Sequence, residues 1–194
     1  MKRLVIAIDC DDVLVSGTEH VISSYNKTYG TQVRIEHAHQ SDNPEWETDR
    51  DEVFRRIHAI QQSDEYALIT PDQETIQVVE ALAGQHDLYV VSARHRKVLG
   101  VTQTMLDRYF PGCFKGIEHV GDERTKGEVC DQLGAQVMID DNIKNLLSAQ
   151  EAGVEKLIWY GDYPWQNYDE WAEGVSRCLS WGDIKREIDE LARQ

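Results

Sequence analysis

The sequence predicts an α/β fold, with a parallel sheet covered by helices on both faces. Short apolar segments typical of buried strands alternate along the chain with longer segments of helical pattern. Residues 16–68 break this alternation, because they carry two helical patterns without a good strand between them. We therefore expect a core made of residues 1–15 and 69–194, and a small α-helical cap, residues 16–68, inserted between the first and second core strands.

The expected strands are short, rich in β-branched residues and apolar along most of their length. Residues 3–9 show the pattern most clearly, since an apolar run there ends at a carboxylate. A weaker strand pattern lies near residues 117–120. The remaining expected core strands are residues 88–92, 136–140 and 156–160.

The expected helices carry their own start and stop signals. Residues 70–73, Thr-Pro-Asp-Gln, have the pattern of a capping box with proline at the first helical position, and Gly84 marks the end of that helix. The other expected core helices are residues 95–109, 125–134, 143–152 and 180–191. Inside the inserted segment, helices are expected at residues 19–29, closed by Gly30, and at residues 48–61.

Composition places the chain among soluble globular proteins and narrows its partners. Apolar residues make up 41% and charged residues 28% of the 194 residues. The net charge of −15 repels nucleic-acid backbones, so a polynucleotide partner is not expected. No apolar run approaches the roughly 20 residues needed to cross a bilayer, and the apolar stretch that follows Met1 is too short for a signal peptide. We therefore expect a cytoplasmic protein without a membrane partner.

The four cysteines form no CxxC pair and are widely spaced, which is typical of reduced, mostly buried thiols. Cys10 lies between Asp9 and Asp11. Because side chains alternate along an extended chain, Cys10 is expected to face away from Asp9 and to pack in the core.

Polar residues of the kind used in phosphate chemistry follow the strand patterns. They are Asp9, Asp11, Ser92, Lys126, Asp140 and Asp141. The carboxyl ends of parallel strands line the ligand crevice of an open α/β sheet, so these side chains are expected to converge there.

The roles expected of the acids follow from phosphoryl transfer. Asp9 is the expected nucleophile, because a carboxylate can attack phosphorus once the phosphate charge is neutralised. Asp11, two residues on, can protonate the leaving oxygen and then activate water. Asp140 and Asp141 supply hard oxygen ligands suited to Mg²⁺, which keeps several waters and needs few protein ligands. Crowded carboxylates raise one another's pKa, so a divalent cation is also an electrostatic requirement.

Two further side chains complete the expected site. Ser92 can hydrogen-bond a phosphate oxygen, and Lys126 offers a compact positive charge to the same group. Taken one at a time, such residues are commonplace, since serine is often a helix cap and lysine is mostly solvated. The ordered set, in which each acid or serine ends a strand, is much harder to produce by chance.

This order of motifs resembles the haloacid dehalogenase superfamily over nearly the whole core. The matching residues are Asp9, Asp11 and Val13 for its first motif, Ser92 for the second, Lys126 for the third, and Asp140 with Asp141 for the fourth. The resemblance implies a five-stranded Rossmann-like core and an aspartyl-phosphate mechanism. It also implies Mg²⁺ bound by Asp9, the backbone carbonyl of Asp11, and Asp140 or Asp141. The true dehalogenases of this superfamily lack the second aspartate, so Asp11 favours phosphate chemistry, and residues 16–68 stand where its type 1 caps stand.

A finer resemblance points to the 5′(3′)-deoxyribonucleotidase branch. The patterns are Ser92-Ala93-Arg94, Tyr163-Pro164-Trp165-Gln166-Asn167, Gly174-Val175-Ser176-Arg177 and Ser180-Trp181. The resulting interpretation is a hydrolase that acts on nucleoside monophosphates, with a small phosphorylated substrate as its partner. Arg94, Trp46 and Tyr66 are the expected substrate-binding residues, because aromatic rings stack on bases and Arg94 follows the second motif. Trp46, Phe54 and Tyr66 also fit the packed core of the cap.

Other functions stay open on the sequence. A phosphatase for a sugar phosphate or another small metabolite is the main alternative, because caps of this type serve many ligands. A receiver-like signalling module is disfavoured, since Asp140-Asp141 follows Lys126 by 14 residues and the chain is too long. A non-catalytic phosphate-binding protein is disfavoured because every expected catalytic group is present. The sequence does not determine the oligomeric state, and His37 and His39 are expected in a solvated cap loop.

Overall fold

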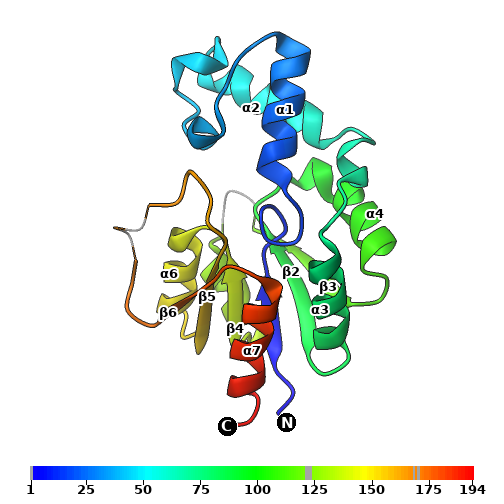
Figure 1. The fold of residues 1–194 in the computed structure, drawn as a ribbon, viewed down its shortest axis with the longest axis vertical. Helices are drawn as coiled ribbons and strands as arrows, with labels where there is room; N and C mark the ends of the chain where they lie inside the picture. Colours follow the sequence, from blue (N-terminus) through cyan, green and yellow to red (C-terminus); the bar gives the residue numbers. More distant parts are fainter. Residues whose placement is uncertain (1, 121–123, 168, 170) are drawn as a thin grey trace.

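The computed structural model describes residues 2–120, 124–167, 169 and 171–194. Within these residues, six strands form one sheet in the order β3-β2-β1-β4-β5-β6, and every neighbouring pair is parallel (Figure 1). The strands are β1 Val5–Ile8, β2 Asp87–Ser92, β3 Phe114–His119, β4 Val137–Asp140, β5 Lys156–Tyr160 and β6 Val175–Cys178. The strand order reverses between β1 and β4, and in an open α/β sheet such a switch point opens a crevice at the carboxyl ends.

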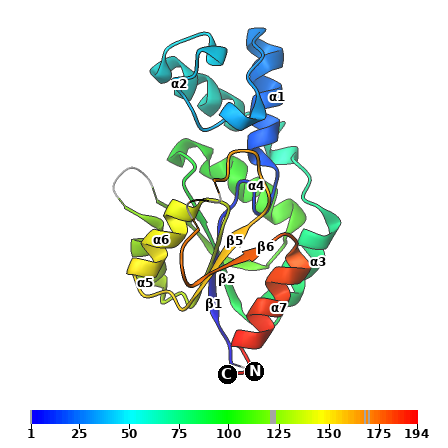
Figure 2. The same ribbon diagram turned by 60° about the vertical axis from the view of Figure 1, so that its left-hand side comes forward.

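Side chains that alternate along the strands bury the two faces of the sheet under different helices (Figure 2). Ile6 and Ile8 of β1 belong to the apolar cluster on one face, and Ala7 belongs to the cluster on the other. The first face is covered by α3 Gln73–Ala83, α4 Leu99–Tyr109 and α7 Trp181–Leu191, and the second by α5 Lys126–Leu133 and α6 Ile143–Glu151. The expected parallel sheet with helices on both faces is therefore confirmed. Among the described helices, none has the length and apolar character that a membrane span requires.

Capping boxes fix where two of these helices begin. Thr125 and Glu128 form a capping box at the start of α5, and Gly134 closes that helix in the left-handed conformation at φ 63°. Ser180 and Asp183 form a second capping box before α7. The first cap sets the opening turn of α5 at the carboxyl edge of the sheet, where a phosphate-binding lysine was expected.

The prediction of a capping box at residues 70–73 is wrong. Helix α3 begins after Asp72, whose side chain makes no capping hydrogen bond. The Thr70 hydroxyl instead lies 3.4 Å from the Leu68 carbonyl oxygen and 3.3 Å from the Tyr109 hydroxyl. Thr70 is therefore engaged by the segment that enters the core, and not by the helix.

Other boundaries also differ from the expected ones. The five strands implied by the resemblance become six, because β6 adds to β5; its polar sequence, Val-Ser-Arg-Cys, gave no strand signal. Helix α4 begins at Leu99 and not at residue 95, because a 3₁₀ turn precedes it, in which His95 accepts a hydrogen bond from the Lys97 backbone N–H at 3.1 Å. Strand β3 begins at Phe114, before the expected residues 117–120.

Residues 16–68 form a helical segment with an apolar cluster of its own. Its two helices are α1 Gly17–Tyr29 and α2 Arg50–Gln61. Gly30 closes α1 in the left-handed conformation at φ 73°, as the sequence predicts. The cluster includes Tyr25, Trp46 and Val53, which are fully buried. The segment lies beyond the carboxyl ends of the strands, at the opposite end of the molecule from the two chain termini (Figures 1 and 2).

Candidate active site

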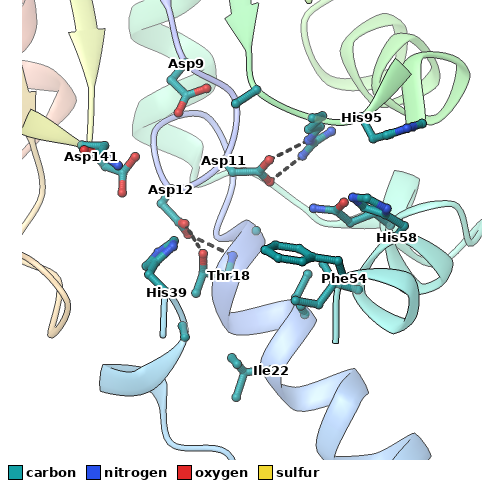
Figure 3. Close-up of a pocket in the computed structure, with 18 of the residues that line it drawn as sticks. Asp9, Asp11, Asp12, Thr18, Ile22, His39, Phe54, His58, His95 and Asp141 are labelled. Atoms are coloured by element: carbon teal, nitrogen blue, oxygen red, sulfur yellow. Dashed lines mark hydrogen bonds and ion pairs between the residues drawn. The ribbon is translucent and has the colours of Figure 1, made fainter. Parts of the chain in front are cut away.

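A pocket of about 400 Å³ lies between the carboxyl ends of the strands and the helical segment 16–68 (Figure 3). This volume is in the range of small-molecule sites. The expected site residues that line it are Asp9, Asp11, Trp46, Tyr66, Arg94, Lys126 and Asp141. Ser92 and Asp140 are buried and lie outside this lining.

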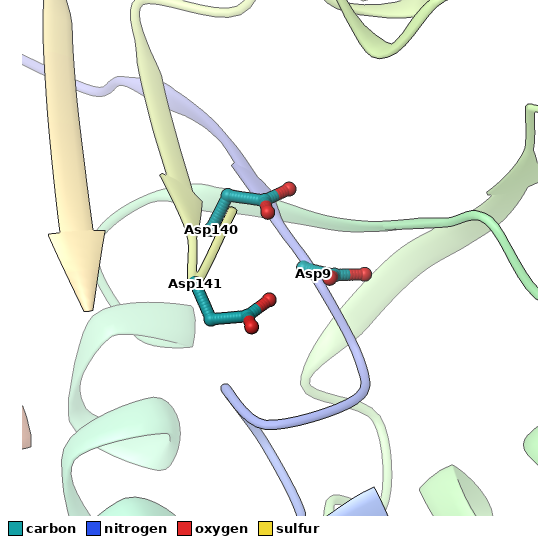
Figure 4. A group of neighbouring side chains, drawn as sticks. All are labelled: Asp9, Asp140 and Asp141. Atoms are coloured by element: carbon teal, nitrogen blue, oxygen red, sulfur yellow. The ribbon is translucent and has the colours of Figure 1, made fainter. Parts of the chain in front are cut away.

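Three buried carboxylates come together where β1 and β4 end. Oxygen atoms of Asp9, Asp140 and Asp141 lie within 4.8 Å of one another (Figure 4). Burial raises the pKa of Asp9; Lys126 opposes this shift and the charge of Asp140 adds to it. Burial, followed by repulsion from Asp140 and Asp9, raises the pKa of Asp141 well above its usual value. Hard oxygen donors that carry excess negative charge suit a divalent cation, so this donor set fits Mg²⁺.

Lys126 bridges two of these carboxylates from the first turn of α5. Its Nζ atom lies 2.8 Å from Asp9 Oδ1 and donates to Asp140 Oδ2 at 2.7 Å. Asp140 also accepts from the Asn142 backbone N–H at 2.8 Å and from Asn145 Nδ2 at 3.0 Å. Both Asp140 oxygens are therefore engaged by protein groups, and the charge of Lys126 is held beside Asp9.

A loop after β5, residues 161–167, contacts both acid-bearing segments. Trp165 Nε1 donates to Asp141 Oδ2 at 3.1 Å. Tyr163 Oη donates to the Asp12 carbonyl oxygen at 2.6 Å. The loop therefore links the end of β4 to the connection between β1 and α1.

Asp11 is held by two side chains from distant parts of the chain. Arg94 donates to both carboxylate oxygens of Asp11 at 2.7 Å, and Tyr66 Oη donates to Oδ1 at 2.6 Å. Burial alone would raise the pKa of Asp11, but the charge of Arg94 and these hydrogen bonds lower it overall. Gly17 leaves room for the carboxylate, since a Cβ atom there would lie 1.9 Å from Asp11 Oδ1. Figure 3 shows the Asp11 carboxylate turned away from Asp9.

Ser92 and Arg94 form the turn that follows β2. Ser92 Oγ accepts a hydrogen bond from the Arg94 backbone N–H at 3.1 Å. The buried Arg94 guanidinium also donates from Nη1 to Thr102 Oγ1 at 3.0 Å and lies 4.8 Å from the ring centroid of Tyr66. Its partners are thus protein groups, and the substrate contact expected of Arg94 stays a prediction.

Residues 3–194 match the family described as 5′ nucleotidase, deoxy (pyrimidine), cytosolic type C protein. The chain belongs to this family. The resemblance and the enzyme class expected from the motifs are thereby confirmed, and the chain is a phosphomonoester hydrolase of the haloacid dehalogenase type. No curated protein matches the chain.

Solved structures share the fold of this nucleotidase-family chain at low sequence identity. A haloacid dehalogenase-like hydrolase from Streptococcus pneumoniae has a TM-score of 0.68 at 14% identity, with 97% of this chain and 98% of that chain covered. A predicted phosphoglycolate phosphatase from Haemophilus somnus has a TM-score of 0.69 at 14% identity, with 97% and 99% covered. A HAD-hydrolase from Bacillus subtilis, bound to magnesium, has a TM-score of 0.66 at 11% identity, with both chains fully covered at 100%. At these identities the similarity establishes the fold.

In this nucleotidase-family chain, the aromatic residues expected to meet a base lie in different surroundings. Trp46 is fully buried, and its Nε1 donates to the Gln40 carbonyl oxygen at 2.9 Å. Tyr66 is also fully buried, with its hydroxyl on Asp11. Phe54 is 39% exposed and lines the pocket. Phe54 therefore presents the most accessible ring of the three.

Two histidines, His58 and His95, line the pocket next to Phe54, and the three rings form one wall of it. The His58 ring lies 6.5 Å from that of Phe54 and 4.9 Å from that of His95, measured between centroids. Figure 3 shows the three residues on the same side of the pocket. Because His58 belongs to α2 and His95 to the turn after β2, this wall joins the helical segment to the core.

The histidine pair expected in a solvated loop divides between two environments. His37 Nδ1 lies 2.8 Å from Glu45 Oε2. His39 lines the pocket, and its ring lies edge-on to that of Trp165 at 5.2 Å. His39 is exposed, as expected of a solvated loop, but its place in the pocket lining is a feature that the sequence interpretation missed.

Asp12 is a second missed site residue. It adopts a left-handed conformation at φ 59°, which aspartate tolerates better than most residues. Its carboxylate accepts from the Thr18 backbone N–H at 3.1 Å and from the Thr18 hydroxyl, so it caps the start of α1. Burial, with repulsion from Asp11, raises the pKa of Asp12 to about 7. The sequence signal that could have identified Asp12 is its position as a third acid, after Asp9 and Asp11, in the turn that follows the first strand.

Proposed function

We propose that this chain is a Mg²⁺-dependent phosphomonoester hydrolase that forms a phospho-aspartate at Asp9 and acts on nucleoside monophosphates, deoxy forms included. The position of Asp9 carries the proposal. Its carboxylate lines the pocket, lies 2.8 Å from Lys126 Nζ and is within 4.8 Å of two other buried acids. The family description supports a nucleotide substrate and a cytosolic place of action.

Asp9, the backbone carbonyl of Asp11 and the Asp141 carboxylate are the groups proposed to hold Mg²⁺. Asp141 is favoured over Asp140 for the direct contact, because both Asp140 oxygens already accept hydrogen bonds from protein groups. The Asp141 carboxylate accepts one hydrogen bond from the residues described, and that bond comes from an indole. When bound, Mg²⁺ neutralises negative charge so that two anions can approach each other.

The proposed reaction has two steps. In the first, an Asp9 oxygen bonds to phosphorus while the bond from phosphorus to the ester oxygen breaks, and Asp11, once it has left Arg94 and taken up a proton, gives that proton to the leaving oxygen. In the second, Asp11 takes a proton from the water that attacks the acyl phosphate, which frees inorganic phosphate and regenerates Asp9. Lys126 balances the phosphate charge throughout, and Ser92 hydrogen-bonds a phosphate oxygen from the end of β2.

Residues 16–68 are proposed to act as a cap over a core made of residues 1–15 and 69–194. Their separate apolar cluster and their share of the pocket lining support this division. Phe54 offers an accessible ring on which a base can stack. Trp46 and Tyr66 shape the wall behind it, and selectivity for the leaving group arises from this side of the pocket.

A substrate panel with and without Mg²⁺ tests the proposal. Nucleoside monophosphates should be turned over faster than sugar phosphates, and activity should vanish with a chelator and return with Mg²⁺. Asp9→Asn should abolish turnover, whereas Asp11→Asn should lower it by about 10²–10⁴-fold. Near-native rates of Asp9→Asn would contradict the mechanism. A panel led by sugar phosphates would contradict the nucleotide assignment and support a small-metabolite phosphatase instead.

A further inference from the structure

Trp165 lies in a segment that the proposed chemistry does not use, yet it contacts the site. Its Nε1 donates to Asp141 Oδ2 at 3.1 Å. The main chain of Asp141 is already fixed, because its carbonyl oxygen accepts from Trp159 Nε1 at 2.7 Å and from Gln166 Nε2 at 2.8 Å. The remaining freedom of Asp141 is rotation of its carboxylate. Among the described groups, the Trp165 indole is the hydrogen-bond donor that restrains this rotation.

The indole of Trp165 is itself held in place. Its ring stacks on that of Tyr163, with centroids 4.6 Å apart and planes inclined by 2°. Tyr163 is anchored at both ends, since its Oη donates to the Asp12 carbonyl oxygen at 2.6 Å and its backbone N–H donates to Gln166 Oε1 at 3.1 Å. The indole N–H therefore reaches Asp141 from a fixed frame, and not from a freely moving loop.

The same indole contacts the helical segment across the pocket. The ring of His39 lies edge-on to it, with centroids 5.2 Å apart and an interplanar angle of 64°. His39 and Asp141 both line the pocket, and Figure 3 shows His39 beside Asp12. Trp165 is thus in contact with a carboxylate of the acid cluster and with a residue of the helical segment at the same time.

We propose that Trp165 is a positioning residue that couples cation binding at Asp141 to the seating of His39 over the pocket. The inference rests on the proposed function, in which Asp141 holds Mg²⁺. A donor bonded to a metal-ligating carboxylate fixes its orientation, and its loss typically weakens metal affinity by about ten- to a hundredfold. Because couplings between binding events are reciprocal, a seated His39 loop favours the cation, and the bound cation favours the seated loop.

Isothermal titration calorimetry of the full chain with MgCl₂, without substrate, measures the coupling. Trp165→Phe keeps a stacked ring and removes the N–H, so Mg²⁺ affinity should fall by about ten- to a hundredfold. His39→Ala removes the ring contact and should lower the affinity by about two- to tenfold, whereas His39→Phe should stay close to wild type. His37→Ala is the matched control, because His37 pairs with Glu45.

Hydrogen exchange gives a second readout that does not depend on activity. Mg²⁺ should slow exchange of the amides of residues 38–43 in the wild type and should not do so in Trp165→Phe. Wild-type Mg²⁺ affinity in Trp165→Phe or in His39→Ala would overturn the coupling and leave the proposed function standing. A wild-type chain that binds no Mg²⁺ would instead defeat the proposed function, and the coupling with it. If Trp165→Phe does not fold, the contrast between His39→Ala and His39→Phe decides the matter.

Discussion

Carboxylates of one chemical type are prepared for different tasks in this site because their partners differ. Asp9 is raised in pKa by burial and stays close to Lys126. Asp11 is lowered in pKa, overall, by the guanidinium that holds both of its oxygens. Asp140 is saturated with protein donors, while Asp141 accepts a single indole N–H among the described contacts. The neighbours of each acid thus set its charge and the oxygens it has left to offer, and the roles proposed for the four acids rest on these differences.

Removal of the Tyr66 hydroxyl tests how Asp11 is positioned. Tyr66→Phe should slow the first turnover of a nucleoside monophosphate by about ten- to a hundredfold, since hydrogen bonds to charged groups contribute roughly 1.5–3 kcal/mol. With p-nitrophenyl phosphate the loss should be smaller, because a good leaving group departs without a proton. Rapid-quench measurement of both substrates checks this. Tyr109→Phe is the control, as its hydroxyl donates to the Leu68 carbonyl oxygen at 3.1 Å. Equal losses on both substrates would count against the positioning role.

Phe54 offers a test of base recognition. Base–aromatic stacking contributes roughly 1–3 kcal/mol, so Phe54→Ala should lower kcat/KM for nucleoside monophosphates by about ten- to a hundredfold. Hydrolysis of p-nitrophenyl phosphate should change little, because it presents no base. Leu68→Ala is the control, since Leu68 is 49% exposed and lies outside the described pocket lining. An unchanged preference for nucleotides over sugar phosphates would exclude Phe54 as the stacking surface.

At the scale of elements, the first turn of α5 is stabilised by a helix cap and also carries Lys126, a residue of the candidate site. The Thr125 capping box fixes the turn that carries Lys126. Gly127 lets α5 approach α6 closely, because a Cβ atom there would lie 2.1 Å from the Ser148 carbonyl oxygen. The lysine is therefore held by its own helix cap and by tight helix–helix packing, before any substrate arrives.

The two capping boxes provide a matched pair of variants. Thr125→Ala and Ser180→Ala should each lower the free energy of unfolding by about 1 kcal/mol in urea denaturation, because each leaves a helix N–H without its acceptor. Only Thr125→Ala should also lower kcat, since it loosens the turn that holds Lys126 next to Asp9. A similar loss of kcat in Ser180→Ala would point to a general effect of stability.

The elements that could be predicted from the sequence are those with local signals. Strands β1, β2, β4 and β5 are covered on both faces, so their apolar runs are continuous and the polar residues that end them stand out. The capping boxes of α5 and α7 are equally local. The partnership of Asp11 with Arg94 joins residues 83 positions apart, and that of Asp141 with Trp165 joins residues 24 apart. No local pattern encodes such contacts, and none indicated that the exposed His39 would line the pocket.

At the scale of the whole molecule, acidic residues outnumber basic ones, and several of the acids gather in the pocket. The net charge is −15, and the pocket gathers Asp9, Asp11, Asp12 and Asp141 around Lys126 and Arg94. Burial raises the pKa of Asp9, Asp12 and Asp141, so folding without a cation works against ionisation of these groups. Bringing these carboxylates together therefore costs folding free energy, and a cation bound among them would offset that cost.

This charge predicts how pH and Mg²⁺ act on stability. The folded pKa of Asp12 is about 7, above its ordinary value, so the folded chain binds this proton more tightly than the unfolded chain. Stability from this source is full below about pH 4 and is lost as the pH rises toward about 7. Burial also raises the pKa of Asp9, a proposed Mg²⁺ ligand, to about 7, so protons compete with the cation for its oxygens at lower pH. Mg²⁺ should therefore raise Tm more at about pH 7.5 than at about pH 5.5. Scanning fluorimetry with Mg²⁺ or chelator checks this, and equal shifts at both pH values would contradict it.

The apolar cluster of residues 16–68 is separate from the two clusters that hold the sheet. Substitutions inside that segment, away from residues such as Tyr66 and His58 that contact the core, therefore act on its own packing, and their effects on stability add nearly independently to those in the core. For evolution this means that the range of leaving groups can drift while the turn from Asp9 to Asp12 is inherited unchanged.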